Sequence, residues 1–362
     1  IMAIKYKWLA ARLKEMIFSY IEKGIEKLPT EQELCERFRV SRQTVRLSLS
    51  LLEEEGLIVK RQGSGSYITG LLSEPESNII GILISDDQDY IYPGLINDIQ
   101  TELSRNGFSS RVYVSGRRTR TERRILTDIL NRPLRGLIAE GCRSALPNPN
   151  LDLYRRLRDR GMALLFLNSP YAALNDCPYI KDDNLAGSAL LVRHLTELGH
   201  TAIGGIFAAD EVQGIERYQG FTETMRDCGL PVPDERVSWF LAKDVDELMK
   251  RRDTGFLRRI ASESLEDCTA VICHNDMIAY YLIQELRMAG KRLPEDMAVA
   301  SFDNTYLSNS EWLTITSLSH GLHEPGREAA RMMVRRLKGL PVQSLELPWE
   351  LKQKQSTGKP SS

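Results

Sequence analysis

Eight short apolar runs separated by helical patterns constrain the fold of this chain more than any other feature of its sequence. This alternation predicts parallel sheets covered by helices. The runs divide into two sets of four with a join near residues 182–188, which predicts two similar α/β lobes with a cleft between them. The expected strands span residues 79–84, 111–114, 137–139 and 163–167 in the first lobe, and 202–208, 237–241, 270–273 and 298–302 in the second. A last strand is expected within residues 345–351, and the polar residues 352–362 are expected to fray.

The N-terminal region carries a different pattern. Apolar residues recur every four positions from residue 9 to residue 21, which predicts an amphipathic helix. Thr30 and Glu33 stand at capping-box spacing and predict a short second helix. Ser41 is a good N-cap for a third helix, and the glycine-containing turn at 61–65 predicts a hairpin. Three helices and a hairpin make a winged helix-turn-helix.

A multidomain organisation follows from these two patterns. We expect a winged helix-turn-helix domain at residues 1–70, a linker at 71–78, and a two-lobed α/β domain at 79–362. Residues 70–78 contain Gly, Ser and Pro without periodicity, which is typical of a linker.

Charge is unevenly distributed between these parts. The whole chain has a net charge of −1, whereas residues 1–72 contain twelve Lys and Arg against nine Asp and Glu and therefore carry +3. This asymmetry predicts that the small domain presents the phosphate-binding surface. Arg42, Gln43 and Arg46 suit base reading, because a guanidinium can grip a guanine edge and a Gln amide an adenine edge. Lys5, Lys7 and Lys60 are candidate phosphate contacts.

Other classes of protein are disfavoured. Six scattered cysteines include no C-x-x-C pair, so we expect neither a metal site nor a disulfide framework, and a cytoplasmic location. No secretion signal or membrane span is expected. His194 and His200 are expected to be structural, and one of Asp182 and Asp183 to cap a helix. No nucleophile with a base is evident, so we do not expect an enzyme.

The N-terminal segments KYKWLAARLKEMI and LPTEQELCERFRVSRQTVRLSLSLLEEEGLIVKRQGSGSYI resemble the DNA-binding domain of GntR-family repressors across nearly all of residues 5–69. Two departures from that family are Arg39 in place of the usual glycine of the turn, and a shorter segment between Gly24 and Leu28. Combined with the chemistry above, the resemblance implies a DNA-binding set of Lys5, Glu31, Ser41, Arg42, Gln43, Thr44, Arg46, Gln62 and Gly63.

The remainder resembles the effector domain of the lactose-repressor family, itself similar to periplasmic sugar-binding proteins, through GLIAEG, FLNSPY, GIERYQGF, CHNDMIA, SFDN and TSLSH. The resemblance implies sugar contacts at Glu140, Asn168, Arg217, Asn275, Asp303 and His320. Tyr90 and Tyr92 follow the first strand of this domain and are expected to supply aromatic surface for the C–H faces of a sugar. The segments FAADEVQGIERYQGF and ELPWEL resemble the subgroup that responds to L-arabinose.

These observations favour a homodimeric transcriptional repressor that binds operator double-stranded DNA and is released by a sugar, with no cofactor other than that effector. The opposing carboxylates of Glu140 and Asp303 outnumber Arg217 and favour a neutral sugar, with L-arabinose implied by resemblance. Two alternatives stay open: a sugar-binding or sugar-processing protein without DNA function, and a repressor that answers another sugar or a sugar phosphate.

Overall fold

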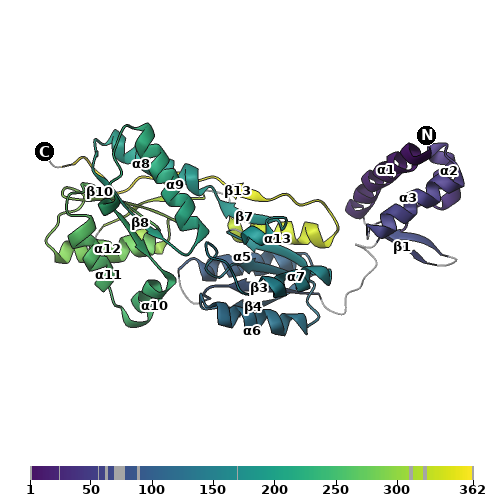
Figure 1. The fold of residues 1–362 in the computed structure, drawn as a ribbon, viewed down its shortest axis with the longest axis horizontal. Helices are drawn as coiled ribbons and strands as arrows, with labels where there is room; N and C mark the ends of the chain where they lie inside the picture. Colours follow the sequence, from purple (N-terminus) through teal and green to yellow (C-terminus); the bar gives the residue numbers. More distant parts are fainter. Residues whose placement is uncertain are drawn as a thin grey trace.

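The computed structural model describes residues 2–23, 25–55, 57–61, 64–68, 78–87, 90–168, 170–309, 313–320 and 324–360. The expected linker at 71–78 lies outside these residues except for Asn78, and so do Gln62 and Gly63. A small N-terminal domain stands at one end of the molecule, and two α/β lobes follow it (Figure 1). In the described part of the chain, no helix is long and apolar enough to cross a membrane.

The N-terminal domain is the expected winged helix-turn-helix. Its elements are α1 Met2–Glu22, α2 Glu31–Phe38, α3 Arg42–Glu54, β1 Ile58–Arg61 and β2 Gly65–Ile68. The two strands pair in antiparallel register, as expected for a hairpin. Leu9, Leu13 and Ile17 of α1 pack with apolar residues of α2, α3 and both strands, so the four-residue period does mark a buried stripe.

Local capping sets where the helices of the turn begin and end. Thr30 and Glu33 form the reciprocal capping box at the start of α2, and the Ser41 hydroxyl accepts from the Thr44 amide at the start of α3. Between the helices, Arg39 adopts the left-handed conformation with φ 51° and donates its amide toward α2. The turn therefore keeps the geometry that glycine favours, at a cost of about 1–2 kcal/mol for a residue with a Cβ.

The first lobe has a parallel sheet in the order β13-β7-β6-β5-β3-β4. Its strands are β3 Ile79–Ile84, β4 Ser109–Val114, β5 Gly136–Glu140, β6 Ala163–Leu167, β7 Tyr179–Asp182 and β13 Leu345–Leu347. Helices α5 Tyr92–Arg105 and α13 Pro325–Leu337 cover one face, and α6 Thr119–Leu130 and α7 Leu151–Asp159 cover the other.

The second lobe repeats this architecture with a sheet in the order β14-β12-β11-β10-β8-β9, in which only β14 runs antiparallel in the described pairings. Its strands are β8 Ile203–Ala208, β9 Val237–Phe240, β10 Ala270–Cys273, β11 Ala298–Phe302, β12 Thr316–Ser319 and β14 Glu350–Lys352. Helices α8 Asn184–Glu197 and α9 Val212–Asp227 cover one face, and α10 Ala242–Arg251, α11 Gly255–Arg259 and α12 Asp276–Met288 the other.

The expected join near residues 182–188 is present between β7 and α8, but the expectation of four strands per lobe with a single join was wrong. The sheet of each lobe has six described strands, and the chain passes between the lobes three times: after β7, after β12 and after β13. The strands β7 and β12 were missed because two of the four residues of YIKD and three of the four residues of TSLS are polar. Two of the crossovers are very short: one residue separates β7 from α8, and two residues separate β13 from β14.

The expectation of a frayed C-terminal tail was also wrong. The Val299 amide donates to the Ser356 carbonyl, and the Ser356 side chain is fully buried. His194 and His200, expected to be structural, hold the same tail: His194 pairs with Thr357, and His200 with the carbonyl of Gly358. The tail is therefore part of the second lobe because hydrogen bonds compensate for its polarity.

Candidate functional site

A cavity of about 470 Å³ separates the two lobes at the carboxyl ends of their parallel strands. This is the edge at which α/β sheets bind ligands, because loops and helix N-termini converge there. All of the expected effector positions line it: Tyr90, Tyr92, Glu140, Asn168, Arg217, Asn275, Asp303 and His320. The structure thus brings together residues that lie up to 230 positions apart in the chain.

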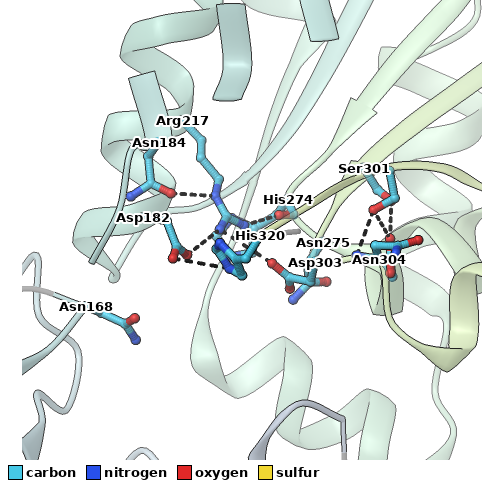
Figure 2. A network of polar contacts seen from close by, with 12 residues as sticks. Asn168, Asp182, Asn184, Arg217, His274, Asn275, Ser301, Asp303, Asn304 and His320 are labelled. Carbon is cyan, nitrogen blue, oxygen red and sulfur yellow. Dashed lines mark hydrogen bonds and ion pairs between the residues drawn. The ribbon is translucent and has the colours of Figure 1, made fainter. Parts of the chain in front are cut away.

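Arg217 is the most buried charged group of the cleft, with 2% of its surface exposed. Its Nε donates to the Asn184 side chain at 2.9 Å, and its Nη1 donates to the His274 carbonyl. The guanidinium also lies 4.1 Å from the ring centre of Phe302. These contacts fix the orientation of the guanidinium, so that its Nη2 lies 3.8 Å from the carboxylate of Asp182 and 3.7 Å from that of Asp303 (Figure 2).

Asp182 is a cleft residue that the sequence left ambiguous. Asp183 caps α8 by accepting from the Ala186 amide, as expected for one member of the pair, while the preceding Asp182 lines the cleft. Its carboxylate lies 3.4 Å from Nε2 of His320, whose ring stacks on Trp349 with centroids 4.0 Å apart. Burial raises the pKa of Asp182. A carboxylate held between a guanidinium and an imidazole is a suitable acceptor for sugar hydroxyls.

Tyr90 makes a contact that its expected role did not include. This residue belongs to the first lobe, yet its hydroxyl donates to Oδ2 of Asp303 in the second lobe at 2.5 Å and accepts from the Asp276 amide. Its backbone has φ 62°, a conformation that costs a tyrosine free energy. Tyr90 therefore offers more than an aromatic face: its hydroxyl bridges the two lobes across the cleft.

The wall of the first lobe is organised around Glu140. This carboxylate accepts from the Ser85 amide at 2.7 Å, the Asn168 side chain at 3.0 Å and the Tyr92 hydroxyl at 3.2 Å. Burial raises the pKa of Glu140. Glu140 and Asn168 therefore form one rigid polar unit, because each holds the orientation of the other.

Asn275 both caps a helix and lines the cleft. Its side-chain oxygen accepts from the Ile278 amide at the start of α12. The neighbouring His274 lies 3.6 Å from Glu211, and Arg117 lies 3.7 Å from Asp86; all four also line the cleft. Sequence reasoning gave no role to these four. His274 and Glu211 lie within the segments CHNDMIA and FAADEVQGIERYQGF, whereas Asp86 and Arg117 lie in strand-to-helix connections without a distinctive motif.

The lining residues carry more negative than positive charge. Seven are acidic: Asp86, Asp98, Glu140, Asp182, Glu211, Asp303 and Glu324. Three are Lys or Arg: Arg117, Lys181 and Arg217. Such a cavity favours a neutral ligand with several hydroxyls over an anion, since an anion would meet uncompensated carboxylates.

Direct contacts also join the lobes beside the cleft. Arg143 of the first lobe pairs with the buried Asp210 of the second at 2.9 Å, and the Val212 amide donates to the Ser144 hydroxyl. A ligand that changes the angle between the lobes must change these contacts.

The N-terminal end of α3 presents the candidate DNA-reading side chains. Arg42, Gln43 and Arg46 are exposed, and Nε of Arg46 pairs with Glu31 at 2.9 Å. Thr44, in contrast, is buried and its hydroxyl bonds to that of Ser41, which favours a capping role for both over base reading. Lys5 is exposed on α1, whereas Lys60 is paired with Glu53 at 2.8 Å.

Comparisons with known proteins agree with this architecture. Residues 5–68 match the gntR family of bacterial regulatory proteins, and residues 192–357 match the periplasmic binding protein-like domain. The arabinose metabolism transcriptional repressor of Geobacillus stearothermophilus is 31% identical over 333 residues, which cover 90% of each chain. The repressor of the same name from Halalkalibacterium halodurans is 27% identical over 340 residues, covering 92% of this chain and 89% of that one.

Solved structures of transcription regulators share the fold. The complex of the regulator CelR with cellobiose has a TM-score of 0.66 and 22% identity, covering 88% of this chain and 92% of that chain. The regulator CcpA of Lactococcus lactis has a TM-score of 0.67 and 17% identity, covering 78% of this chain and all of that one. With both domains and nearly the whole length shared, the chain belongs to the family of arabinose metabolism transcriptional repressors, in which a gntR-type DNA-binding domain is joined to a periplasmic-binding-protein-like domain.

Proposed function

We propose that this protein is a repressor of sugar-utilisation genes that binds operator DNA as a homodimer and is released when L-arabinose occupies the interlobe cleft. The observation that carries the proposal is the composition of the cleft. Carboxylates and amides of both lobes surround one fixed guanidinium, as hydroxyl recognition requires. Arabinose is the sugar named for the relatives with the highest similarity reported above.

The mechanism follows from the placement of these groups. Arg217 and Asp303 belong to the second lobe, and Glu140 and Asn168 to the first, so a sugar ring that touches both sets favours one interlobe angle. Operator DNA favours the conformation in which the two winged domains of the dimer are as far apart as its half-sites. That separation is about 34–36 Å or a multiple of it. Sugar and DNA then oppose each other reciprocally, because each shifts the equilibrium by its differential affinity.

The test is a titration of the full-length repressor bound to operator DNA with L-arabinose, D-xylose, D-galactose and their phosphate esters. We expect L-arabinose to release the DNA at the lowest concentration. Release by a phosphate ester alone would refute the neutral-sugar assignment, because the cleft carries seven acidic side chains against three Lys and Arg.

Arg46→Ala is expected to weaken specific operator binding by about 1–3 kcal/mol, because the variant loses one base contact. Arg46 is exposed, and among the described residues it pairs only with Glu31, through its Nε, so its other nitrogens are available to a guanine edge. Gel shifts on operator and on random DNA measure the effect, with Arg12→Ala as an exposed control on α1. Equal losses on both DNAs would make Arg46 a phosphate contact instead.

Tyr90→Phe is expected to tighten L-arabinose binding up to about tenfold, or 1.4 kcal/mol. In the free protein the Tyr90 hydroxyl donates a hydrogen bond to Oδ2 of Asp303. A sugar hydroxyl that bonds to this oxygen must displace the Tyr90 hydroxyl. Calorimetry on the variant and on a Tyr306→Phe control, at an exposed tyrosine that also borders the cleft, measures the change. Weaker binding in Tyr90→Phe would show that the hydroxyl contacts the sugar itself.

A further inference from the structure

A second groove lies at the edge of the first lobe opposite to the cleft. It has a volume of about 500 Å³ and borders the starts of β5 and β6, whereas the cleft borders their ends. Helices α6, α7 and α13 all end beside it. Its walls combine apolar side chains, among them Leu134, Met162 and Leu337, with four arginines: Arg132, Arg135, Arg160 and Arg336. In the described part of the chain, no acidic residue lines it.

The protein itself satisfies only part of this positive charge. Arg132 pairs with Asp128 through its Nε at 2.5 Å, and Arg160 donates one bond to the Leu130 carbonyl at 2.6 Å. Arg135 lies over the ring of Phe108 at 5.7 Å. Among the described residues, no carboxylate lies within ion-pair distance of Arg135 or Arg336, and burial lowers the pKa of Arg135. Two partly buried guanidiniums therefore lack a counterion.

Helix ends reduce this charge but do not cancel it. Each helix C-terminus contributes roughly −0.5 of a charge, so the three ends supply about −1.5. With Asp128 the opposing charge is about −2.5, against +4 from the four arginines. The groove is thus positive inside a two-lobed domain whose net charge is negative. Each guanidinium has five N–H donors, and within the described ranges Arg132 and Arg160 each use one of them in a hydrogen bond.

We propose that this groove binds a small organic phosphate as a second effector, separate from the sugar cleft. A phosphate dianion matches several guanidiniums, which bind its oxygens in pairs. The apolar wall takes the organic part of the ligand, and the volume is typical of small-molecule sites. Three residues after Leu337, Leu340 packs against the core of the winged domain. An occupant of the groove therefore adjoins the contact between the first lobe and the DNA-binding domain.

The test is calorimetry on the full chain with glucose 6-phosphate, adenosine monophosphate and inorganic phosphate. We expect at least one organic phosphate to bind more tightly than inorganic phosphate, and Arg135→Ala and Arg336→Ala each to weaken it at least tenfold. Arg155→Ala, at an exposed position of α7 outside the groove, is the matched control and should bind normally. No binding by any probe, or equal binding in all variants, overturns the proposal.

Further measurements exclude other positions for the phosphate. If Asp303→Asn abolishes phosphate binding, the ligand occupies the sugar cleft and the proposal is wrong. If Arg135→Ala weakens operator binding in the absence of phosphate, the groove contacts DNA and the proposal is again wrong. Arg135→Gln, checked by circular dichroism, guards against a folding defect. Release of operator by L-arabinose should be normal in all groove variants, so failure of the groove and failure of the proposed function give different results.

Discussion

Asp303→Asn is expected to bind operator DNA normally but to need roughly ten- to a hundredfold more L-arabinose for release. The carboxylate lies on the second-lobe side of the cleft, 3.7 Å from Nη2 of Arg217, and receives the Tyr90 hydroxyl. Hydrogen bonds to a charged group are worth about 1.5–3 kcal/mol, and the amide removes this charge while keeping the shape. Operator affinity should be unaffected because the substitution leaves the winged domain unchanged.

Asp303 is a better position for this test than Arg217. The guanidinium of Arg217 also bonds to Asn184 and to the His274 carbonyl and stacks on Phe302, so its removal leaves buried acceptors unpaired inside the second lobe. Loss of sugar response in Arg217→Ala would therefore mix a binding defect with a folding defect.

Calorimetry with L-arabinose and gel shifts on operator DNA measure the two halves of the prediction. Asp227→Asn, at an exposed carboxylate at the end of α9, is the matched control. Normal release in Asp303→Asn would remove this carboxylate from the effector site. A parallel loss of operator affinity would instead show that Asp303 acts on the DNA-bound conformation without sugar.

The strands that the sequence predicted well are those buried on both faces. β3, β6, β10 and β11 have the expected bounds, because runs such as ALLFL and AVIC have no polar interruption to blur their ends. β7 and β12 were not predicted, since both contain polar residues whose partners lie far along the chain. In β7 burial alternates and Lys181 pairs with Glu216, whereas β12 buries the polar residues Thr316 and Ser317, which bond to Ser356 and Asp276. The join expected near residues 182–188 is the crossover after β7. The other two crossovers were not predicted, because β12 was missed and because the single strand expected within residues 345–351 is two short strands in different sheets.

The resemblance to a known family identified most of the candidate cleft residues. The other cleft residues could not be identified, because only the tertiary structure places them in the cleft. Asp182 and Asp183 look equivalent in the sequence, but one is a strand end facing the cleft and the other is a helix cap. The hydroxyl of Tyr90 meets a carboxylate 213 residues away, a contact that no local pattern encodes. At Arg39 the turn usually has glycine, and a residue with a Cβ disfavours the left-handed conformation. In the structure Arg39 adopts that conformation nevertheless.

The burial of Glu122 could not be predicted from the sequence either. Substitution of this residue is expected to have the largest effect on the free energy of unfolding. In the sequence it is one more charge on an amphipathic helix, yet the structure buries it completely within the first lobe. Its carboxylate accepts from the Cys142 amide, from the side chains of Asn148 and Asn150, and from the hydroxyls of Tyr154 and Tyr171. Five donors converge on one acceptor group, which compensates for the burial of its charge.

Glu122→Gln is expected to lower the free energy of unfolding by about 3 kcal/mol, because an amide must direct its NH₂ group at some of these donors. The Tyr171 hydroxyl can accept one N–H while it donates to the Cys142 carbonyl, but the asparagines cannot turn to accept the second without loss. The Asn148 oxygen already accepts from the Asn150 amide, and the Asn150 nitrogen also donates to the Thr119 carbonyl. Urea unfolding measures the change, and Asp159→Asn, exposed at the end of α7, serves as the control.

The same substitution should also loosen the contact between the lobes, because the Glu122 network anchors the segment that makes it. Residues 142–150 carry Arg143 and Ser144, which bond to Asp210 and to the Val212 amide of the second lobe, and the Ala145 amide donates to the Asp210 carbonyl at 3.2 Å. Hydrogen exchange at the Ala145 amide should therefore accelerate in Glu122→Gln under conditions in which both lobes are still folded. A variant that loses less than about 0.5 kcal/mol and keeps this amide protected would show that the asparagines and tyrosines hold the segment without the carboxylate.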